Sequence, residues 1–152
     1  MRGCYLDMRG CYLDIGPPCN HELLEGMGDV TKTHRRWQTS QHSSFVPSLT
    51  FDGALAICLS DRGTLAGIQP DTGQTVWAMD LPKHRSSYYA SPSVVGDKLI
   101  AAREDGALFV LQLGKKPQLI GGKELGERVI ASPVFDGTQL LIRSEKHLIS
   151  YR

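Results

Sequence analysis

Long hydrophobic runs and a dominant charge of one sign are both missing from this sequence of 152 residues. Its 17 basic and 16 acidic residues give a net charge of +1, which offers no general attraction for nucleic acid or an anionic membrane. A membrane-spanning helix needs about 20 consecutive apolar residues, and neither such a run nor a signal peptide is present. The most basic stretch, residues 32–37, is interpreted as the solvated face of a strand. We therefore expect no nucleic-acid partner and no membrane span.

Cysteines are few, and none has the Cys-x-x-Cys spacing that structural zinc sites usually use to fix two ligands on one turn. Cys4, Cys11 and Cys19 lie near the beginning of the chain with His21 close behind. A thiolate-rich zinc site is one interpretation, but cysteines without a ligand role in a duplicated segment are the favoured one. Cys58 lies in an apolar run and is predicted to be a small buried residue.

Residues 1–27 differ in character from the rest. The heptad Met-Arg-Gly-Cys-Tyr-Leu-Asp occurs at residues 1–7 and again, unchanged, at residues 8–14. Two heptads are too few for a coiled coil, and the Gly-Pro-Pro at residues 16–18 interrupts regular structure. We predict that residues 1–27 form an irregular leader.

The rest of the chain carries a repeat with a period of about forty residues. Its copies begin at residues 48–53 (Ser-Leu-Thr-Phe-Asp-Gly), 91–96 (Ser-Pro-Ser-Val-Val-Gly) and 132–137 (Ser-Pro-Val-Phe-Asp-Gly), at offsets of 43 and 41 residues. Within each copy, short runs rich in branched apolar residues alternate with polar turns, which indicates strands rather than helices. Periods of this length are typical of propellers, solenoids and arrays.

Glycines mark the turns between the predicted strands. The first turn of each copy contains Asp-Gly or Gly-Asp, which suits a two-residue hairpin with positive φ. Ten residues after the first-turn glycines come Gly63, Gly106 and His147. Because histidine costs about 1 kcal/mol or more in a left-handed conformation, we expect His147→Gly to stabilise the third copy.

A third run follows in each copy, and residues 71–77 (Asp-Thr-Gly-Gln-Thr-Val-Trp) open a fourth strand in the first copy. Three or four antiparallel strands in about forty residues make one propeller blade. The sequence therefore predicts an all-β fold: an incomplete β-propeller of about three antiparallel blades with three to four strands each. The predicted organisation is the leader at 1–27 and blades over 28–152, with the tail of a preceding blade at 28–43 and blades at 44–82, 87–125 and 128–152.

The motifs make a more specific resemblance visible. Ser-Pro at 91–92, Asp-Gly-Ala-Leu at 105–108 and Asp-Thr-Gly at 71–73 followed by Trp77 resemble the repeat of quinoprotein-alcohol-dehydrogenase-like (PQQ-like) propellers. The stretch from residue 28 to residue 151 is similar to bacterial proteins of this kind often labelled outer-membrane assembly lipoproteins.

In that family the tryptophan and glycine of the motif dock neighbouring blades, which implies architectural roles for the matching residues here. Trp37 is interpreted as the corresponding aromatic of a preceding blade, and Ile120 is expected to occupy the tryptophan position of the second copy. The predicted structural repeat positions are Gly53, Gly63, Asp71, Gly73, Trp77, Pro92, Gly96, Gly106, Pro133 and Gly137.

The resemblance leaves two functional hypotheses open. The favoured one is a non-catalytic propeller segment, a fragment of a larger propeller acting as a scaffold or a recognition module. The alternative is a fragment of a quinone- and calcium-dependent dehydrogenase, whose family commonly has adjacent cysteines that this sequence lacks.

No catalytic, cofactor-binding or metal-binding residue is predicted, since the acidic residues near the turns suit turn roles. The expected partner is another protein or further blades of the same propeller, with a homo-oligomer as one possibility. The family is mostly extracytoplasmic, in the periplasm or cell envelope; the location of this chain itself is left open.

Overall fold

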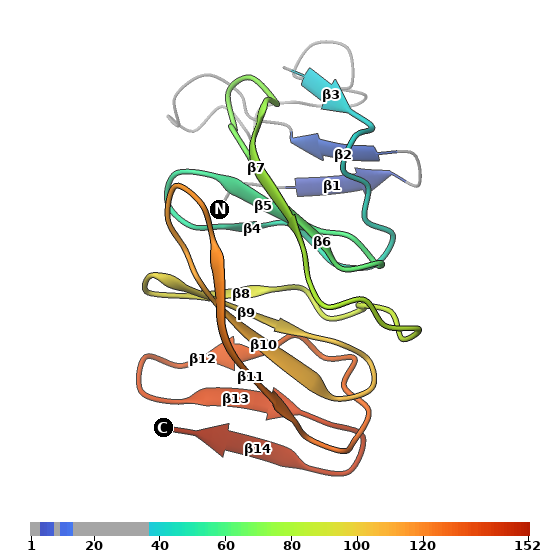
Figure 1. Cartoon of the computed structure of the whole chain (residues 1–152), viewed down its shortest axis with the longest axis vertical. Coiled ribbons are helices and arrows are strands. Elements are labelled where there is room, and N and C mark those ends of the chain that lie inside the picture. The colour runs from blue at the N-terminus through green and yellow to red at the C-terminus, as the bar shows by residue number, and fades with distance from the viewer. Residues whose placement is uncertain (1–3, 8–9, 14–36) are drawn as a thin grey trace, which may run out of the picture.

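The structure, a computed structural model, describes residues 4–7, 10–13 and 37–152. Over these residues the chain consists of strands and turns, which form four antiparallel sheets in which sequence neighbours pair (Figure 1). The N-terminal sheet contains β1 (Cys4–Asp7), β2 (Gly10–Leu13) and β3 (Trp37–Thr39). The first blade contains β4 (Thr50–Phe51), β5 (Ala56–Leu59), β6 (Thr64–Ile68) and β7 (Thr75–Asp80). The second blade contains β8 (Ser93–Val95), β9 (Lys98–Ala102), β10 (Ala107–Gln112) and β11 (Gln118–Glu124), and the third contains β12 (Val134–Phe135), β13 (Leu140–Arg143) and β14 (Leu148–Tyr151).

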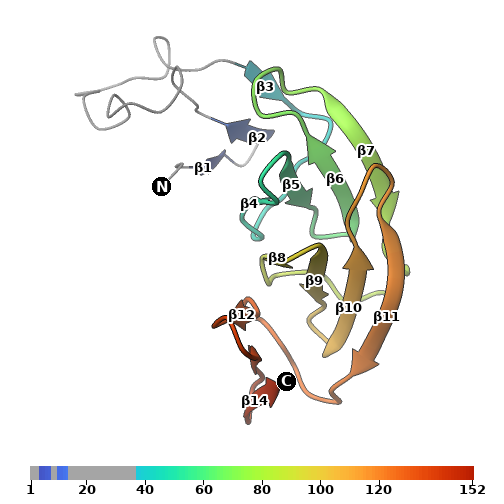
Figure 2. The same ribbon diagram turned by 90° about the vertical axis from the view of Figure 1, so that its left-hand side faces the viewer.

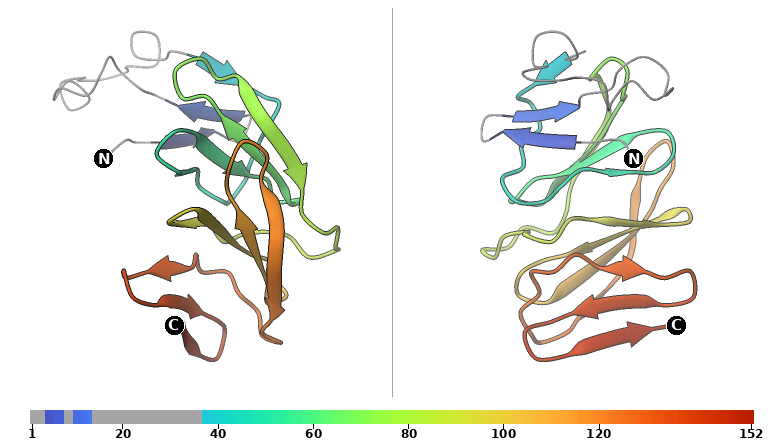
Figure 3. Two further views of the ribbon diagram at one scale, coloured as in Figure 1. Left: turned by 60° about the vertical axis from the view of Figure 1, so that its left-hand side comes forward. Right: turned by 180° about the vertical axis from the view of Figure 1, so that it is seen from behind.

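The three blades are stacked along an arc. Strands β4, β8 and β12 lie along its inner side, and β7 and β11 along its outer side (Figure 2). The inner strands contact one another from blade to blade. The N-terminal sheet lies at the opposite end of the stack from the third blade (Figure 3). The predicted fold class, all-β with antiparallel sheets of three or four strands, is confirmed.

Burial of the middle strands on both faces explains their composition. All four residues of β5 are buried, because the first blade is covered on one side by the second blade and on the other by the N-terminal sheet. Ile57 and Leu59 pack toward the second blade, whereas Cys58 packs with the half-buried Trp37. A strand covered on both faces is expected to be continuously apolar, as β5 is. We call the side of each blade that faces the next blade its forward face.

The leader differs from the prediction at two places. Cys4–Asp7 and Gly10–Leu13 are strands that pair with each other, and Gly10–Leu13 also pairs with β3, so irregular structure was the wrong expectation for these residues. The physical reason is that each heptad copy carries a short Cys-Tyr-Leu run, which has good strand propensity, and β3 offers an edge for it to pair with. Residues 16–18 and Cys19 and His21 lie outside the described residues. The division of the chain into predicted segments stays a prediction.

The first turns of the blades are of two kinds. In the second blade Val95 pairs with Lys98, which leaves the predicted two-residue hairpin of Gly96 and Asp97. In the first and third blades the turns contain four residues, so the prediction was wrong there. These longer turns are held by an aspartate: Oδ1 of Asp52 accepts hydrogen bonds from two turn amides at 2.7 and 2.8 Å. Asp136 does the same at 2.8 and 2.9 Å, and hydrogen bonds led by Gln139 hold its pKa below the usual value.

The second turns require glycine for two reasons in the first two blades. Gly63 and Gly106 have φ values of 90° and 96°, a region that L side chains rarely adopt. In addition, a Cβ at Gly63 would lie 2.8 Å from Cε2 of Tyr88, and one at Gly106 would lie 2.3 Å from the carbonyl oxygen of Glu127. Each glycine thus also allows close approach of the chain that leads to the next blade.

His147 does not stand at the corresponding glycine position. Ser60 N–H donates to the carbonyl of Thr64, four residues on, whereas Ser144 N–H donates to the carbonyl of His147, three residues on. The third blade's turn is therefore one residue shorter, and His147 takes the place of Thr64. Its Nδ1 lies 2.7 Å from Oε1 of Glu127. The expected stabilisation by His147→Gly rested on the wrong alignment and loses its basis.

Candidate docking interfaces

The connectors between blades form a repeated set of backbone hydrogen bonds. Leu81 N–H, in the first connector (residues 81–90), donates to the carbonyl of Gly63 at 2.9 Å, and Tyr88 N–H donates to that of Asp61 at 3.0 Å. In the second connector (residues 125–131), Leu125 N–H donates to Gly106 and Val129 N–H to Glu104, both at 3.0 Å. Each turn thus serves as a seat that holds the next connector.

The blade that follows each connector also donates a backbone hydrogen bond to that connector. Glu104 N–H donates to the carbonyl of Ser87 at 2.9 Å, and Glu145 N–H donates to that of Arg128 at 2.8 Å. The same positions are used at both interfaces, although the side chains differ. The docking hydrogen bonds therefore depend on backbone groups rather than on particular side chains, in turns whose glycines leave room for the connector.

A ladder of serines joins the inner side of the three blades. Ser48 N–H donates to Oγ of Ser91 at 2.8 Å, and Ser91 N–H donates to Oγ of Ser132 at 2.9 Å. These are the residues at which the three sequence copies begin. Pro92 and Pro133, which follow the last two serines, are buried between the blades.

Two tryptophans pack on glycines at the outer side. Trp37 donates its indole N–H to the carbonyl of Pro70 at 2.7 Å, and a Cβ at Gly73 would lie 2.5 Å from its ring. Trp77 covers Gly67, where a Cβ would lie 2.3 Å from the indole. Each glycine leaves the space that an indole ring fills. Trp37 thereby connects the N-terminal sheet to the turn of the first blade.

The second blade lacks this arrangement, and the reason differs from the prediction. Gly67 pairs with Trp77 in the first blade, and Val110 pairs with Gly121 in the second, with a bulge at the same place in both. Gly121 therefore occupies the tryptophan position. Ile120 corresponds to the bulged Val76, and their exposed fractions are similar, 51% and 54%. The assignment of Ile120 to the tryptophan position was wrong by one residue, because the turn before β11 is one residue longer.

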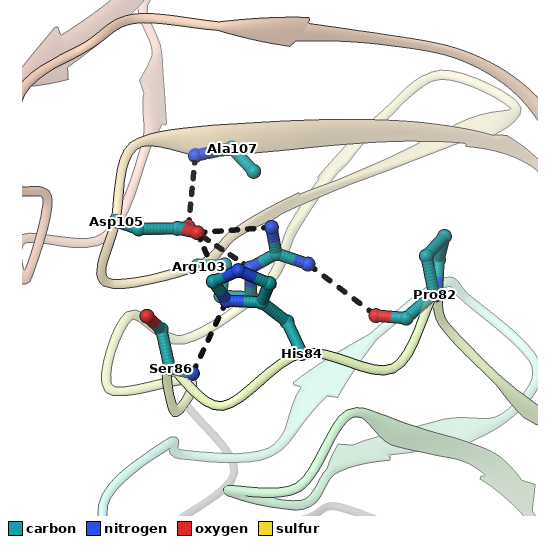
Figure 4. A network of polar contacts seen from close by, with 6 residues as sticks. All are labelled: Pro82, His84, Ser86, Arg103, Asp105 and Ala107. Carbon is teal, nitrogen blue, oxygen red and sulfur yellow. Dashed lines mark hydrogen bonds and ion pairs between the residues drawn. The ribbon is translucent and has the colours of Figure 1, made fainter.

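A polar cluster lies between the first connector and the second blade (Figure 4). Arg103 bonds to Asp105 through Nε at 2.9 Å and Nη2 at 3.0 Å, and its Nη1 donates to the carbonyl of Pro82 at 3.3 Å. Nδ1 of His84 lies 3.1 Å from Oδ2 of Asp105. The hydrogen bonds from Arg103 hold the pKa of Asp105 below its usual value. The cluster fixes the connector to the second blade.

Tyr88 completes this interface from the apolar side. Its ring is buried, lies 6.1 Å from the ring of Phe109, and rests against Gly63. Burial raises the pKa of Tyr88 to about 12, an effect that the nearby Arg103 only partly offsets. The hydroxyl has no hydrogen-bond partner among the described residues. The side chain of Tyr88 therefore contributes to docking through the packing of its ring, in addition to the backbone hydrogen bond to Asp61.

The acidic side chains near the turns are engaged in structural contacts. Asp61 Oδ1 accepts a hydrogen bond from Phe45 N–H at 2.8 Å, and Asp105 is held by Arg103. Over residues 4–7, 10–13 and 37–152 no group of three or more His, Cys, Asp or Glu residues is placed to hold a metal ion. The same part of the chain contains no helix long and apolar enough to cross a membrane.

The predicted repeat positions fall into three groups in the structure. Pro92, Pro133, Gly63, Gly106 and Trp77 lie buried at the interfaces between blades, Gly73 lies under Trp37, and Gly53, Gly96, Gly137 and Asp71 lie in exposed turns. Their role as structural repeat positions stays a prediction. Sequence reasoning assigned no site role to the cluster of Arg103 and Asp105. Arg103 replaces the serine found at this position in the other two copies, which was the available signal.

The forward face of the third blade carries an unfilled seat. A groove there is lined by Arg128, Ile130, Ala131, Arg143, Ser144 and Glu145. The corresponding positions of the second blade hold the second connector. Val134 and Leu148, on the same face, are 56% and 72% exposed. In the described chain this face has the elements of a docking interface without an occupant.

Repeated antiparallel blades, stacked in an arc and joined by equivalent contacts, define the fold as a partial β-propeller. Among solved structures, the chain is similar to BamB from Moraxella catarrhalis, with a TM-score of 0.58, 21% identity, and coverage of 77% of this chain and 36% of that one. The computationally designed proteins Ika8 (TM-score 0.61, 18% identity, 76% of this chain and 35% of that one) and Ika4 (0.64, 17%, 81% and 75%) are also similar.

These likenesses confirm the propeller resemblance at the level of the fold. The chain spans about a third of the length of the first two matched structures. No protein-family model and no curated protein matches the sequence.

Proposed function

We propose that this chain is a non-catalytic β-propeller segment that acts as a scaffold or recognition module and docks with further blades. The observation that carries the proposal is the repeated docking set: connector to seat, and serine to serine, at both interfaces between blades. One of its acceptor positions, the carbonyl of Glu145 in the place of that of Glu104, occurs once more at the groove on the forward face of the third blade, without a connector there.

Exposed apolar residues on that face support the proposal. Leu148 pairs with Arg143 at the register at which Leu108 pairs with Ala102 in the second blade. Leu108 is buried against the third blade, whereas Leu148 is 72% exposed. Contiguous exposed apolar surface marks association sites in soluble proteins. The third blade therefore offers a surface suited to another blade.

Association of the chain should depend on Leu148. The wild-type chain is expected to elute above its monomer mass of 16.7 kDa in light-scattering chromatography, in a concentration-dependent manner. Leu148→Ser should shift it toward monomer with little loss of stability, because the side chain has few contacts to lose. Leu108→Ser is the contrasting variant and should unfold the protein. A wild-type chain that is monomeric at all concentrations and melts cooperatively would contradict the proposal.

The non-catalytic part of the proposal has its own test. Titration of the chain with pyrroloquinoline quinone and calcium is expected to give no change in absorbance spectrum and no shift in melting temperature. Spectral change with stabilisation would instead favour a dehydrogenase segment, and the scaffold proposal would then be wrong.

A further inference from the structure

The groove on the third blade differs from the filled seat of the second blade in one decisive side chain. Ala90 and Ala102 form the floor of the filled seat, and Val129 packs on them. Ala131 precedes Ser132 as Ala90 precedes Ser91, so it is the matching residue. Strand pairing places Arg143 at the position of Ala102. The floor of the unfilled seat therefore carries a guanidinium where the filled one carries a methyl group.

The direction of Arg143 follows from strand alternation. Ile142 is buried against the second blade, so its neighbour Arg143 points to the forward face, where it lines the groove. Among residues 37–152 no carboxylate lies within ion-pair distance of Arg143. The other arginine of the groove, Arg128, is already bonded to Glu104 at 2.8 Å through Nε. Of the two arginines in the groove, Arg143 is thus the one available to an incoming segment; Glu145, which also lines the groove, carries the opposite charge.

An apolar residue such as Val129 would suit this floor poorly. It would cover the guanidinium without supplying an acceptor, and burying an unpaired charge is unfavourable. A carboxylate at that position could instead form a bidentate pair with the planar guanidinium. One backbone acceptor of the seat is kept, because the carbonyl of Glu145 stands where that of Glu104 accepts the N–H of Val129. The turn itself is one residue shorter than in the second blade and has no glycine in the place of Gly106.

We infer that the groove receives an extended connector segment of a following blade that carries an acidic residue at the position occupied by Val129 in the second connector. The inference rests on the proposed docking of further blades and adds the chemistry of the partner. Its N–H donates to the carbonyl of Glu145, its side chain lies over Ala131, and its carboxylate pairs with Arg143.

Two peptides test this preference on the full chain. One has the sequence of residues 125–133, Leu-Gly-Glu-Arg-Val-Ile-Ala-Ser-Pro, and the other has glutamate in place of the valine. Binding is followed by ¹⁵N NMR titration of the amides of Ala131 and Glu145. The wild-type chain is expected to bind the glutamate peptide about fivefold more tightly than the valine peptide, as a partly exposed ion pair of about 1 kcal/mol implies.

Matched variants distinguish an ion pair between Arg143 and the peptide glutamate from a general attraction of the chain for an acidic peptide. Arg143→Ala recreates the floor of the filled seat and should reverse the preference, so that the valine peptide binds more tightly. Arg62→Ala removes the same charge from an exposed turn of the first blade and should leave the preference unchanged.

Equal affinities for the wild-type chain, or a preference that survives Arg143→Ala, would overturn the acidic specificity. Absence of shifts with both peptides, on a folded chain, would show that this face is a solvent-facing cap and would also overturn the inference. The proposed docking of blades is judged separately, by the Leu148→Ser association experiment.

Discussion

Gly106→Ala is expected to lower the free energy of unfolding by about 3 kcal/mol or more. Two costs combine at this position. The backbone has a φ of 96°, which a Cβ strains by about 1–2 kcal/mol, and the new Cβ would lie 2.3 Å from the carbonyl oxygen of Glu127. A backbone carbonyl cannot rotate away as a side chain can. The connector of residues 125–131 would therefore have to leave its seat, which is measured by urea denaturation at matched protein concentration.

Gly53→Ala is the matched control for this prediction. Gly53 has a φ of 100°, close to that of Gly106, but its Cβ would have nothing within 4 Å. Gly53→Ala should cost only the conformational part, about 1–2 kcal/mol. Equal losses of unfolding free energy for the two variants would contradict this prediction. They would mean that the connector can move away from the new Cβ at no cost in stability.

Local features of the fold were predictable from the sequence. The serines at residues 48, 91 and 132 set the repeat, and all three join the same hydrogen-bonded ladder. The turns predicted at Gly63 and Gly106 are present, because the requirement for positive φ is a local property of the backbone. The glycine turns depend on residues within a few positions of one another, and the serines recur at a nearly constant interval, so spacing alone reveals both.

Positions that follow a turn of altered length were not predictable in this way. His147 and Ile120 were each placed one residue away from the position they occupy, after a turn one residue shorter and one residue longer than in the first blade. Residues at equal spacing along the chain do not always occupy equivalent positions in a sheet. A shift of one residue also moves a side chain to the opposite face of the sheet. Only the strand pairing shows that Gly121 has replaced the tryptophan.

The docking chemistry was the least predictable part. The Arg103 cluster joins the second blade to the first connector, about twenty positions earlier in the chain, and the groove of Arg143 combines a connector with a strand. No local motif describes either. The signal was a departure from the repeat: Arg103 replaces the serine of the other two copies, and Arg143 stands where the first copy has Leu59 and the second has Ala102. Departures of this kind mark where one interface differs from the next.

Asp105→Ala is expected to lower the free energy of unfolding by about 3 kcal/mol at pH 7. The side chain of Arg103 is only 7% exposed, and Asp105 accepts two of its hydrogen bonds. Without the carboxylate, the guanidinium keeps the carbonyl of Pro82 at 3.3 Å and the face of the Phe109 ring, with its centroid 5.3 Å away. A buried charge that loses its partner is strongly destabilising. Urea denaturation of both proteins measures the loss.

A double variant shows whether the orphaned charge causes the loss. Arg103→Ser introduces the residue that stands at this position in the other two copies, Ser60 and Ser144. Combined with Asp105→Ala it should recover more than half of the stability lost by Asp105→Ala alone, because no buried charge remains. Additive losses would instead show that the two side chains contribute independently, through packing.

The pH dependence of the unfolding free energy tests whether the ionised carboxylate of Asp105 stabilises the fold. Since Arg103 lowers the pKa of Asp105, the stabilisation is fully present above the unfolded value of about 4 and is lost as the pH falls through the lower folded value. The difference in unfolding free energy between wild type and Asp105→Ala should therefore shrink as the pH is lowered from about 5 toward 2. Asp136, whose pKa is also lowered, is present in both proteins and cancels. A difference that stays constant over this range would show that the ionised carboxylate is not what holds Arg103 in the interface.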